Sequence, residues 1–537
     1  MKMKKIFTLG VILLIVVMSI IPTTAQDREK TALPTSSGKW WYVGGSGPGN
    51  YTKIQDAIND SQDGDTVFVF HGVYNEDIEI KKSLYVIGED KNSTIIDGQY
   101  KIPGVVSLLT EHIYFSGFSI IHCRGWGDDY GLSISSYDIV MNNIISDNQG
   151  CKGICISGQY NKILNNIIRN NSFCGIYITY NKNNNNISGN TFINNYLGIL
   201  VGKNHDNVIS GNYVYNSSHE GILIAGYGYK EISNNIIENN TGAAISIRGK
   251  SSDVVVNRNM IKNNGEGLVI DDAQSLTITQ NSFYGQGIQL IGSGLNNWTS
   301  HAMSDNSINE KPIYFFTSEN NIIIPSDAGQ VILASCTNCR VENLYISDVD
   351  YGIQLGFSSN NIITNNHLNN ITELPIKLVQ YSSNNIIEKN TISHNEKNAI
   401  FIDTTSDYGD IYDNLIHNNR GIGIYLQSRS NTITNNSFEN NDGGAYLDFS
   451  YFNVITHNNF INNSRYSISY FIDYSFARSN KFFRNFYDDS NLFLKIVYGV
   501  VKTWIQYYDI NEHLVYLYRP GIEIDWYPAQ EPYDIPG

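Results

Sequence analysis

One phrase of about 23 residues returns along most of the chain and limits what the chain can fold into. From Tyr137 onward it reads as a polar pair ending in Asn, two or three apolar residues, a second Asn pair, and then Gly-Ile-x-Ile. Three instances are ILNNIIRNNSFCGIYI (163–178), ISNNIIENNTGAAISI (232–247) and ITNNSFENNDGGAYL (433–447). A self-similar unit of this length is typical of a solenoid, in which each unit packs on its neighbours.

A single column of Asn residues measures the period of this repeat. Its members are 22 to 24 residues apart, except for a gap of 62 residues between Asn281 and Asn343. The column consists of Asn143, Asn166, Asn190, Asn212, Asn235, Asn259, Asn281, Asn343, Asn366, Asn390, Asn414, Asn436 and Asn458.

The residues inside each unit favour strands over helices. They are rich in Ile, Asn and Gly, of which Asn and Gly disfavour helix, and segments such as 175–178 alternate inward and outward positions. Three such strands and three turns fill one coil. We therefore predict an all-β, single-domain parallel β-helix. Stacked at about 4.8 Å, thirteen coils would make a rod on the order of 60 Å long.

Stacking of coils gives both repeated columns a physical role. Asn tolerates left-handed turn angles, and its amide can bond to the Asn of the next coil, so we expect the Asn column to be structural. The apolar column is expected to form the stacked core. It consists of Ile154, Ile176, Ile199, Ile222, Ile245, Ile353, Ile376, Ile400 and Ile424.

Outside the repeat, the sequence predicts a signal peptide over 1–25, a linker over 26–50, a β-helix over 51–485 and a C-terminal cap over 486–537. Within 51–62, the spacing of Ile54, Ala57 and Ile58 predicts a short amphipathic capping helix. The stretch at about 295–327 interrupts the coils as either a lateral loop or a β-excursion. The C-terminal cap is expected to be irregular and rich in aromatic residues, namely Trp504, Tyr507, Tyr508, Trp526 and Tyr527.

The N-terminus and the charge indicate an exported, acidic protein. Three lysines precede an apolar run at 6–21, and Thr23 and Ala25 favour cleavage after Ala25, with an uncleaved anchor as the alternative. The chain has 36 basic and 51 acidic residues, a charge of −15, and loss of the three lysines gives −18. Nucleic acid is therefore not an expected partner. No later apolar run reaches the length of a membrane span.

The coils resemble those of known β-helix proteins. The run IQDAINDSQDGDTVFVFHGVYNEDIEIKKSLYVIGEDKNSTIIDG (54–98) is similar to the opening of pectin-lyase-like proteins, and the Asn/Ile/Gly coils resemble NosD-like repeats. The segments 325–347 and 524–536 are similar to stretches of exported archaeal members. The resemblance implies a single-stranded right-handed parallel β-helix, and it implies no one activity, because this fold carries lyases, hydrolases, esterases and noncatalytic proteins.

Catalytic signatures of these relatives do not align with the chain. Of the polygalacturonase set, only Asp271-Asp272 and His71-Gly72 have literal counterparts, and they lie in unrelated coils. The resemblance also implies Cu or Ca as a metal by analogy alone. From the residues themselves we predict no metal site and no cofactor, because the His and Met residues are scattered.

The position after each Gly-Ile-x-Ile supplies two candidate carboxylates. Asp403 and Asp448 fall two coils apart, near 9.6 Å by the ~4.8 Å rise, with Gln427 between them. This is the upper edge of the spacing of an inverting glycosidase, and turn-capping aspartates are the alternative. In the same column Arg248 and Asp271, one coil apart, are expected to form a surface ion pair.

Outward positions of the same strands supply candidate aromatic contacts for sugars. Tyr177 is such a residue in the early coils, and Phe401, Tyr425 and Tyr446 form a row in the late coils. Flat rings along a rod can stack on sugar faces. The alternative is the general preference of Tyr for strands.

Six cysteines in an exported chain predict disulfides. The disulfide candidates are Cys151, Cys174, Cys336 and Cys339, with their connectivity left open. Cys151 and Cys174 fall on neighbouring coils, and Cys336 and Cys339 form a lone C-x-x-C with no nearby His. That motif alone is weak support for a zinc or redox site.

These observations lead to three hypotheses about function. The first is a secreted or cell-surface protein that binds polysaccharide or cell-envelope glycans without catalysis. The second is a polysaccharide hydrolase or lyase that uses Asp403 and Asp448. The third is NosD-like copper delivery. The acidic charge favours neutral glycans, since it would repel acidic ones unless Ca²⁺ bridged them.

Overall fold

The computed structural model describes residues 38–101, 104–473, 480–488, 495–508, 514–525, 529 and 531–535. The expected signal peptide, most of the expected linker, and Trp526 and Tyr527 of the expected cap lie outside these residues. The described chain is an all-β, right-handed parallel β-helix of about 19 turns, which confirms the predicted fold.

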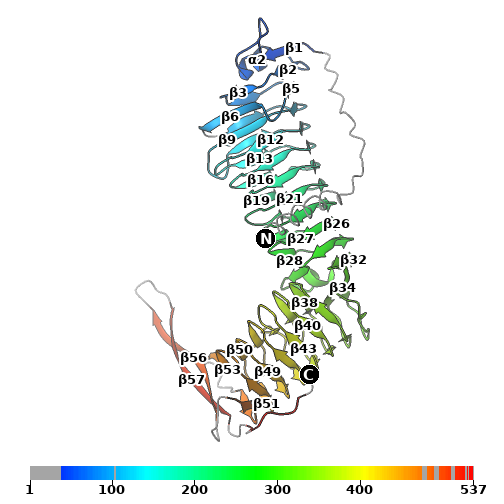
Figure 1. Cartoon of the computed structure of the whole chain (residues 1–537), viewed down its shortest axis with the longest axis vertical. Coiled ribbons are helices and arrows are strands. Elements are labelled where there is room, and N and C mark those ends of the chain that lie inside the picture. Colours follow the sequence, from blue (N-terminus) through cyan, green and yellow to red (C-terminus); the bar gives the residue numbers. More distant parts are fainter. Residues whose placement is uncertain are drawn as a thin grey trace, which may run out of the picture.

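The coils form two stacks that meet at an angle (Figure 1). The first stack, β1 (Trp40–Val43) to β33 (Ser307–Ile308), contains a twelve-stranded sheet from β1 to β32 (Ala302–Ser304) and a ten-stranded sheet from β4 (Ile78–Ile80) to β31 (Ile288–Ile291). Its third row of strands runs from β3 (Gly72–Tyr74) to β33. The predicted straight rod of thirteen coils is therefore too short and lacks the bend.

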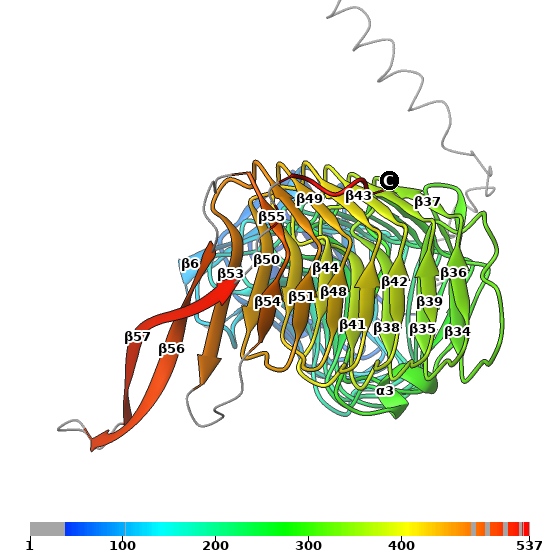
Figure 2. The ribbon, with the colours of Figure 1, turned by 90° about the horizontal axis from the view of Figure 1, so that it is seen from below.

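The second stack contains two seven-stranded sheets, from β36 (Arg340–Glu342) to β54 (Lys481–Phe483) and from β37 (Tyr345–Ser347) to β55 (Phe486–Tyr487). Its third row, which we call the joint sheet, lies beside them in Figure 2. The joint sheet comprises β34 (Lys311–Thr317), β35 (Gln330–Ala334), β38 (Tyr351–Gly356), β41 (Leu374–Val379), β44 (Ile400–Ile402), β47 (Ile422–Leu426), β50 (Gly443–Asp448), β53 (Tyr466–Asp473), β56 (Lys495–Tyr508) and β57 (Leu514–Asp525).

Like side chains stack on like along both parts of the rod. Each residue of the predicted Ile column has no solvent exposure, and register pairs such as Ile154↔Ile176 and Ile176↔Ile199 hold it in line. The Asn column forms a hydrogen-bonded ladder. In it, Oδ1 of Asn259 accepts from both the backbone N (3.0 Å) and Nδ2 (2.9 Å) of Asn235. Both predicted columns are therefore confirmed, apart from Asn343.

Asn343 is exposed and lies one position outside the ladder. Leu344 holds the ladder position in this coil, where its backbone N donates to Oδ1 of Asn366 at 3.0 Å. Asn343 instead adopts φ of 59°, the left-handed conformation of the residue that precedes each rung.

The stretch at about 295–327 is a β-excursion and not a lateral loop. It contains α3 (Asn296–Thr299), and its strands β32 and β33 still pair with the first stack. Asn309 and Glu310 then turn with positive φ, so β34 runs antiparallel to β33 before it pairs in parallel with β35. This reversal of the chain lies at the bend.

The N-terminal end has the predicted capping helix. α2 (Ile54–Asp60) buries Ile54, Ala57 and Ile58 against the first coil, and the Glu76 carboxylate accepts from the backbone N of Ile54 (2.9 Å) and Gln55 (3.0 Å). Strand β1 lies within the segment expected as linker and pairs with β2 (Thr66–Val69), so the solenoid begins before residue 51.

The C-terminal end differs from the expected irregular cap. β55 still pairs in the coils, and β56 and β57 form a long antiparallel hairpin on the joint sheet. The buried Asp525 carboxylate accepts from the backbone N and Nδ2 of Asn485 and so ends the Asn ladder. Regular pairing continues here because backbone groups of the last coil need partners.

Candidate functional site

Three of the four predicted sugar-contact residues lie in one row on the outward face of the joint sheet. Phe401, Tyr425 and Tyr446 occupy consecutive register positions, and their ring centroids are 5.7 Å and 5.3 Å apart. We call these three rings, together with Tyr466, the aromatic strip. The fourth predicted residue, Tyr177, lies in β16 (Cys174–Ile178) of the first stack, with Nζ of Lys152 5.4 Å from its ring.

Tyr466 extends the strip and was not expected from the sequence. Its ring centroid is 6.2 Å from that of Tyr446. It pairs in register with Gly443, and a Cβ at Gly443 would lie 2.6 Å from the Tyr466 ring, so the ring needs a glycine there. A Gly and a Tyr at equivalent positions of neighbouring coils were the available signal.

Hydrogen bonds at one edge of the strip hold its central ring. The Tyr425 hydroxyl donates to Oδ2 of Asp448 at 2.8 Å, and Nε2 of Gln427 donates to the same oxygen at 2.9 Å. Partial burial, with Asp448 as the second cause, raises the pKa of Tyr425. Tyr425 is therefore a neutral, oriented ring with a fixed polar edge.

The other candidate carboxylate, Asp403, bonds to its own turn. Its oxygens accept from the backbone N of Thr405 (3.0 Å), from the Ser406 hydroxyl (2.8 Å) and from the backbone N of Gln380 (2.8 Å). This is the pattern of a turn-capping aspartate. Asp403 and Asp448 share no hydrogen-bond partner among the described residues, and the catalytic role stays a prediction.

The aromatic strip ends at the joint between the stacks. Gln354 and Lys377 precede Phe401 on the same outward row, and both are buried beneath the edge strand β31. Nε2 of Gln354 donates to the Ile288 carbonyl at 2.7 Å, and Nζ of Lys377 to the Leu290 carbonyl at 3.3 Å. Burial lowers the pKa of Lys377 to about 8.

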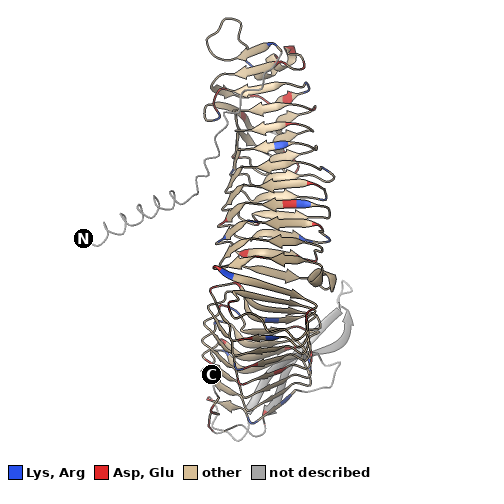
Figure 3. Cartoon of the chain, turned by 90° about the vertical axis from the view of Figure 1, so that its right-hand side faces the viewer, with Lys and Arg blue, Asp and Glu red and all other residues tan. Residues whose placement is uncertain are grey.

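Paired charges flank the joint. Arg248 donates to Glu220 at 2.7 Å rather than to Asp271, which corrects the expected pair. The correction has a simple cause, since Arg248 also bonds Ser246 and therefore runs back along its own strand. On the second stack Lys397 pairs with Glu373 at 2.6 Å. Elsewhere along the strands charges are sparse (Figure 3).

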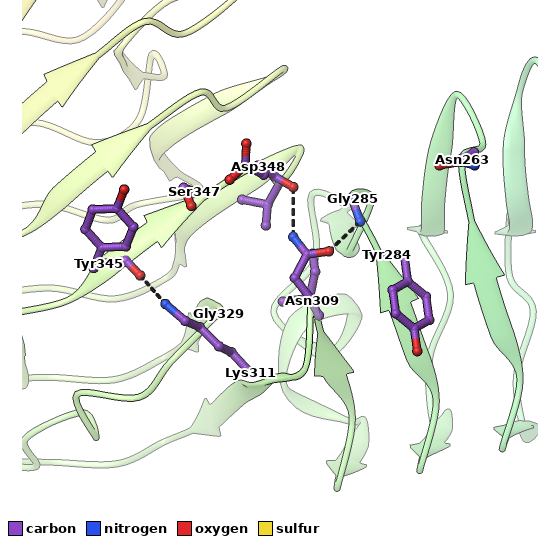
Figure 4. A pocket seen from close by; sticks show the side chains of 11 residues that line it. Asn263, Tyr284, Gly285, Asn309, Lys311, Gly329, Tyr345, Ser347 and Asp348 are labelled. Carbon is purple, nitrogen blue, oxygen red and sulfur yellow. Dashed lines mark hydrogen bonds between the residues drawn. The ribbon is translucent and has the colours of Figure 1, made fainter. Parts of the chain in front are cut away.

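A cavity of about 530 Å³ lies between the last coil of the first stack and the first coil of the second. Figure 4 shows that its polar side chains tie the stacks together. The Asn309 side chain accepts from the Gly285 backbone N at 3.0 Å and donates to the Asp348 carbonyl at 2.9 Å, and Lys311 donates to the Tyr345 carbonyl at 2.7 Å. These groups are engaged in the joint and are not aimed into the cavity as ligands.

The cysteines pair differently from the expectation. Cys151 forms a disulfide with Cys123, with Cα atoms 6.4 Å apart, whereas Cys174, Cys336 and Cys339 are free and buried. The reason is register, because the residue opposite Cys174 in the preceding coil is Lys152, not Cys151. Of the four candidate disulfide cysteines, Cys151 is therefore bonded, and Cys174, Cys336 and Cys339 are not.

The described side chains do not fit a resident copper ion. Among them, no group of three or more His, Cys, Asp and Glu residues lies close enough together to hold a metal. The thiols of Cys336 and Cys174 are held protonated rather than as ligating thiolates, since burial raises the pKa of Cys336 to about 11 and that of Cys174 further.

No helix in the described part of the chain has the length and apolar character needed to cross a membrane.

Several solved structures match the chain at low identity. The catalytic unit of a GH87 α-1,3-glucanase from Streptomyces thermodiastaticus matches with 14% identity, covering 72% of this chain and 65% of that one, with a TM-score of 0.36. The PL6 family alginate lyase AlyGC matches with 12% identity, 79% and 84% coverage and a TM-score of 0.37. A pectin methylesterase from Aspergillus niger matches with 14% identity, 52% and 87% coverage and a TM-score of 0.25.

This chain spans about two thirds of the length of the glucanase unit. The comparison with curated proteins found no match. The family described as periplasmic copper-binding protein (NosD) matches residues 58–216, 173–315 and 307–470, which together cover most of the chain. The chain therefore belongs to the NosD family.

Proposed function

We propose that this chain is exported and binds neutral polysaccharide or cell-envelope glycans on the aromatic strip, without breaking them. The observation that carries the proposal is the row of three half-buried rings in register on the outward face of consecutive coils, with Tyr466 beside its end and neighbouring centroids 5.3 to 6.2 Å apart. Rings already held by packing lose little side-chain entropy when a sugar stacks on them. The acidic charge of −15 and the sparse charges on the strands favour an uncharged ligand.

The proposal is tested by binding to a panel of soluble linear glucans, with alginate and pectate as acidic comparisons. Tyr425→Ala and Tyr446→Ala are expected to weaken binding of a neutral glucan roughly fivefold to tenfold each, the range for loss of one aromatic stack. Tyr425→Phe, which keeps the ring, should retain most of the affinity. Calorimetry gives the affinities.

A matched control lies in the first stack. Tyr160 is 46% exposed and stacks on Tyr137 with centroids 4.9 Å apart, as a surface ring pair remote from the strip. Tyr160→Ala should bind as the wild type does. Equal losses in Tyr160→Ala and Tyr425→Ala, or tighter binding of alginate than of every neutral glucan, would contradict the proposal.

Hydrolysis or lysis is a second candidate, because the carboxylate of Asp448 lies at the edge of the strip and bonds Tyr425. This reading requires new reducing ends or unsaturated products from a bound polysaccharide, and their loss in Asp448→Asn and in Asp403→Asn. Binding with no product over a long incubation would exclude it for the glycans of the panel.

Copper delivery is supported by family membership alone. It requires stoichiometric uptake of copper by the mature chain, measured by metal analysis after desalting, and a wild-type protein that retains none would exclude it.

A further inference from the structure

The aromatic strip is closed at one end by the first stack. Gln354, Lys377 and Phe401 occupy three consecutive positions of the same outward row, one coil apart. The first two are covered, because their side chains bond to backbone carbonyls of β31 at 2.7 Å and 3.3 Å. Phe401 is the first ring beyond this cover, and Figure 1 shows the bend between the stacks at these strands.

The cover also extends toward the start of the strands. Nε2 of Gln289, on the outward face of β31, donates to the Tyr351 hydroxyl at 2.5 Å, and Tyr351 is 4% exposed. The Asp350 carboxylate accepts from the Gly287 backbone N at 2.8 Å. An extended chain that lies along Tyr446, Tyr425 and Phe401 therefore meets packed protein after Phe401.

Unmet hydrogen-bonding groups gather at this closed end. Lys377 is 8% exposed, and its ammonium, which can donate three hydrogen bonds, has one hydrogen-bond acceptor among the described residues and lies 5.4 Å from the centroid of the Tyr351 ring. The buried Oε1 atoms of Gln354 and Gln289 have no hydrogen-bond partner among the described residues. Buried polar atoms normally have partners, and sugar hydroxyls both donate and accept.

We infer that the aromatic strip receives the terminal sugars of a linear neutral glycan, not an internal segment, with the last sugar beside Phe401 and its hydroxyls bonded to the Lys377 ammonium. This inference rests on the proposed function and adds the class of ligand, a chain end. Recognition of a chain end follows from the closed end of the strip, because an internal segment would need room for the glycan chain to continue beyond both ends of the strip.

The test compares short and long preparations of the same linear glucans, namely amylose, an unbranched β-1,3-glucan and an α-1,3-glucan. Light scattering gives the number of protein molecules bound to each glucan chain at saturation. Recognition of ends predicts a number that stays the same as the chain lengthens. A number that grows with chain length, with loss of binding in Tyr425→Ala, would overturn chain-end recognition and leave glycan binding intact. No binding of any glucan would overturn both.

A lysine variant tests the closed end independently. Lys377→Met keeps the length of the side chain and removes the ammonium, and it should weaken binding of the short glucan about tenfold or more, as for the loss of a charged hydrogen bond. Lys162→Met, at an exposed lysine of β14 (Lys162–Leu164) in the first stack, is the matched control and should bind normally. Unchanged affinity in folded Lys377→Met, checked by circular dichroism, would contradict the contact.

Discussion

Asp138 is a buried acid in a position where several coils, including the next one with Asn161, have Asn. Its carboxylate accepts from the backbone N of Ile113 (2.8 Å) and of Ser135 (3.1 Å), and its own backbone N donates to Oδ1 of Asn161 at 2.8 Å. It has no solvent exposure, and burial raises its pKa from 3.8 to about 7. The folded state therefore holds a proton on Asp138 at pH values where the unfolded chain has lost it.

Asp138→Asn should flatten the pH dependence of stability. The raised pKa of Asp138 contributes its full stabilisation of the folded state below pH 4, and this stabilisation is lost as pH rises through about 7. The loss is roughly 4 kcal/mol at most, at about 1.4 kcal/mol per pKa unit. The Asn side chain in the variant stays neutral and extends a second row of stacked Asn side chains, which contains Asn161 and Asn185. Urea unfolding at pH 5 and pH 8 should show a smaller loss in the variant than in the wild type, whereas Asp305→Asn, at an exposed turn, should keep the wild-type loss.

Individual residues were predictable where a column repeats and not where a side chain leaves its column. The Ile positions followed from spacing alone, and so did the row from Phe401 to Tyr446. Arg248 and Asp271 do share a register, but the long Arg side chain reaches Glu220 instead. Spacing gives the backbone position, and the direction of a flexible side chain depends on neighbours that no single column shows.

The Asn ladder is the element that links one coil to the next. Asn259 shows its chemistry, because Nδ2 donates to Oδ1 of Asn281 at 3.0 Å and to the Ile232 carbonyl at 2.8 Å, while Oδ1 accepts twice from Asn235. These groups are buried, so removing the amide leaves several of them without partners.

Asn259→Ala should lower the free energy of unfolding by about 3 kcal/mol or more, since each buried partner left unsatisfied costs about 1–3 kcal/mol. Asn257→Ala is the matched control two residues away, because the Asn257 side chain has no hydrogen bond to a described residue and its oxygen is among the buried unpaired atoms. Its effect should stay within about 0.5 kcal/mol. Denaturant titration of both variants measures the difference, and equal effects would show that the ladder adds little.

The ladder was predictable as a type of element but not at every rung. Asn343 matched the period and the residue type, yet Leu344 holds the position. Several coils carry Asn both at the rung and at the left-handed residue before it, as at Asn165 and Asn166, so a coil with one Asn is ambiguous by one residue. The bond that decides it comes from the next coil.

At the scale of the whole molecule, the bend depends on Gln330. Its buried side-chain amide accepts from the Ile288 backbone N at 3.0 Å and donates to the Ile288 carbonyl at 2.9 Å. The Gln330 side chain therefore gives the edge strand β31 the two hydrogen bonds that the peptide group of a further strand would give. This substitution allows the first stack to end against the second without orphaned backbone groups.

Gln330→Leu should loosen the joint. The substitution leaves the Ile288 N–H without its acceptor, which costs about 1–3 kcal/mol. Hydrogen exchange of the Ile288 amide should therefore accelerate. Exchange of the Leu268 amide, one coil earlier, should change little. Gln274→Leu, at an exposed position, is the control. Unchanged protection of Ile288 in Gln330→Leu would show that Gln330 does not hold the joint.

The overall architecture was predictable, and the bend was not. A repeat reports the contacts of a coil with its neighbours, and these repeat along the chain. The joint is a single event made by nonrepeating residues such as Asn309 and Gln330, which bond across 39 and 42 residues of chain. The closed end of the aromatic strip depends on the joint, and for the same reason it could not be predicted from the sequence repeat.

The most direct test of the account is footprinting of tyrosines with hydroxyl radicals, with and without a saturating neutral glucan, read by mass spectrometry. Glycan binding on the aromatic strip predicts protection of Tyr425 and Tyr446 and unchanged labelling of Tyr137 and Tyr160, which are 43% and 46% exposed in the first stack. Protection of Tyr137 and Tyr160 with none at Tyr425 and Tyr446 would contradict it.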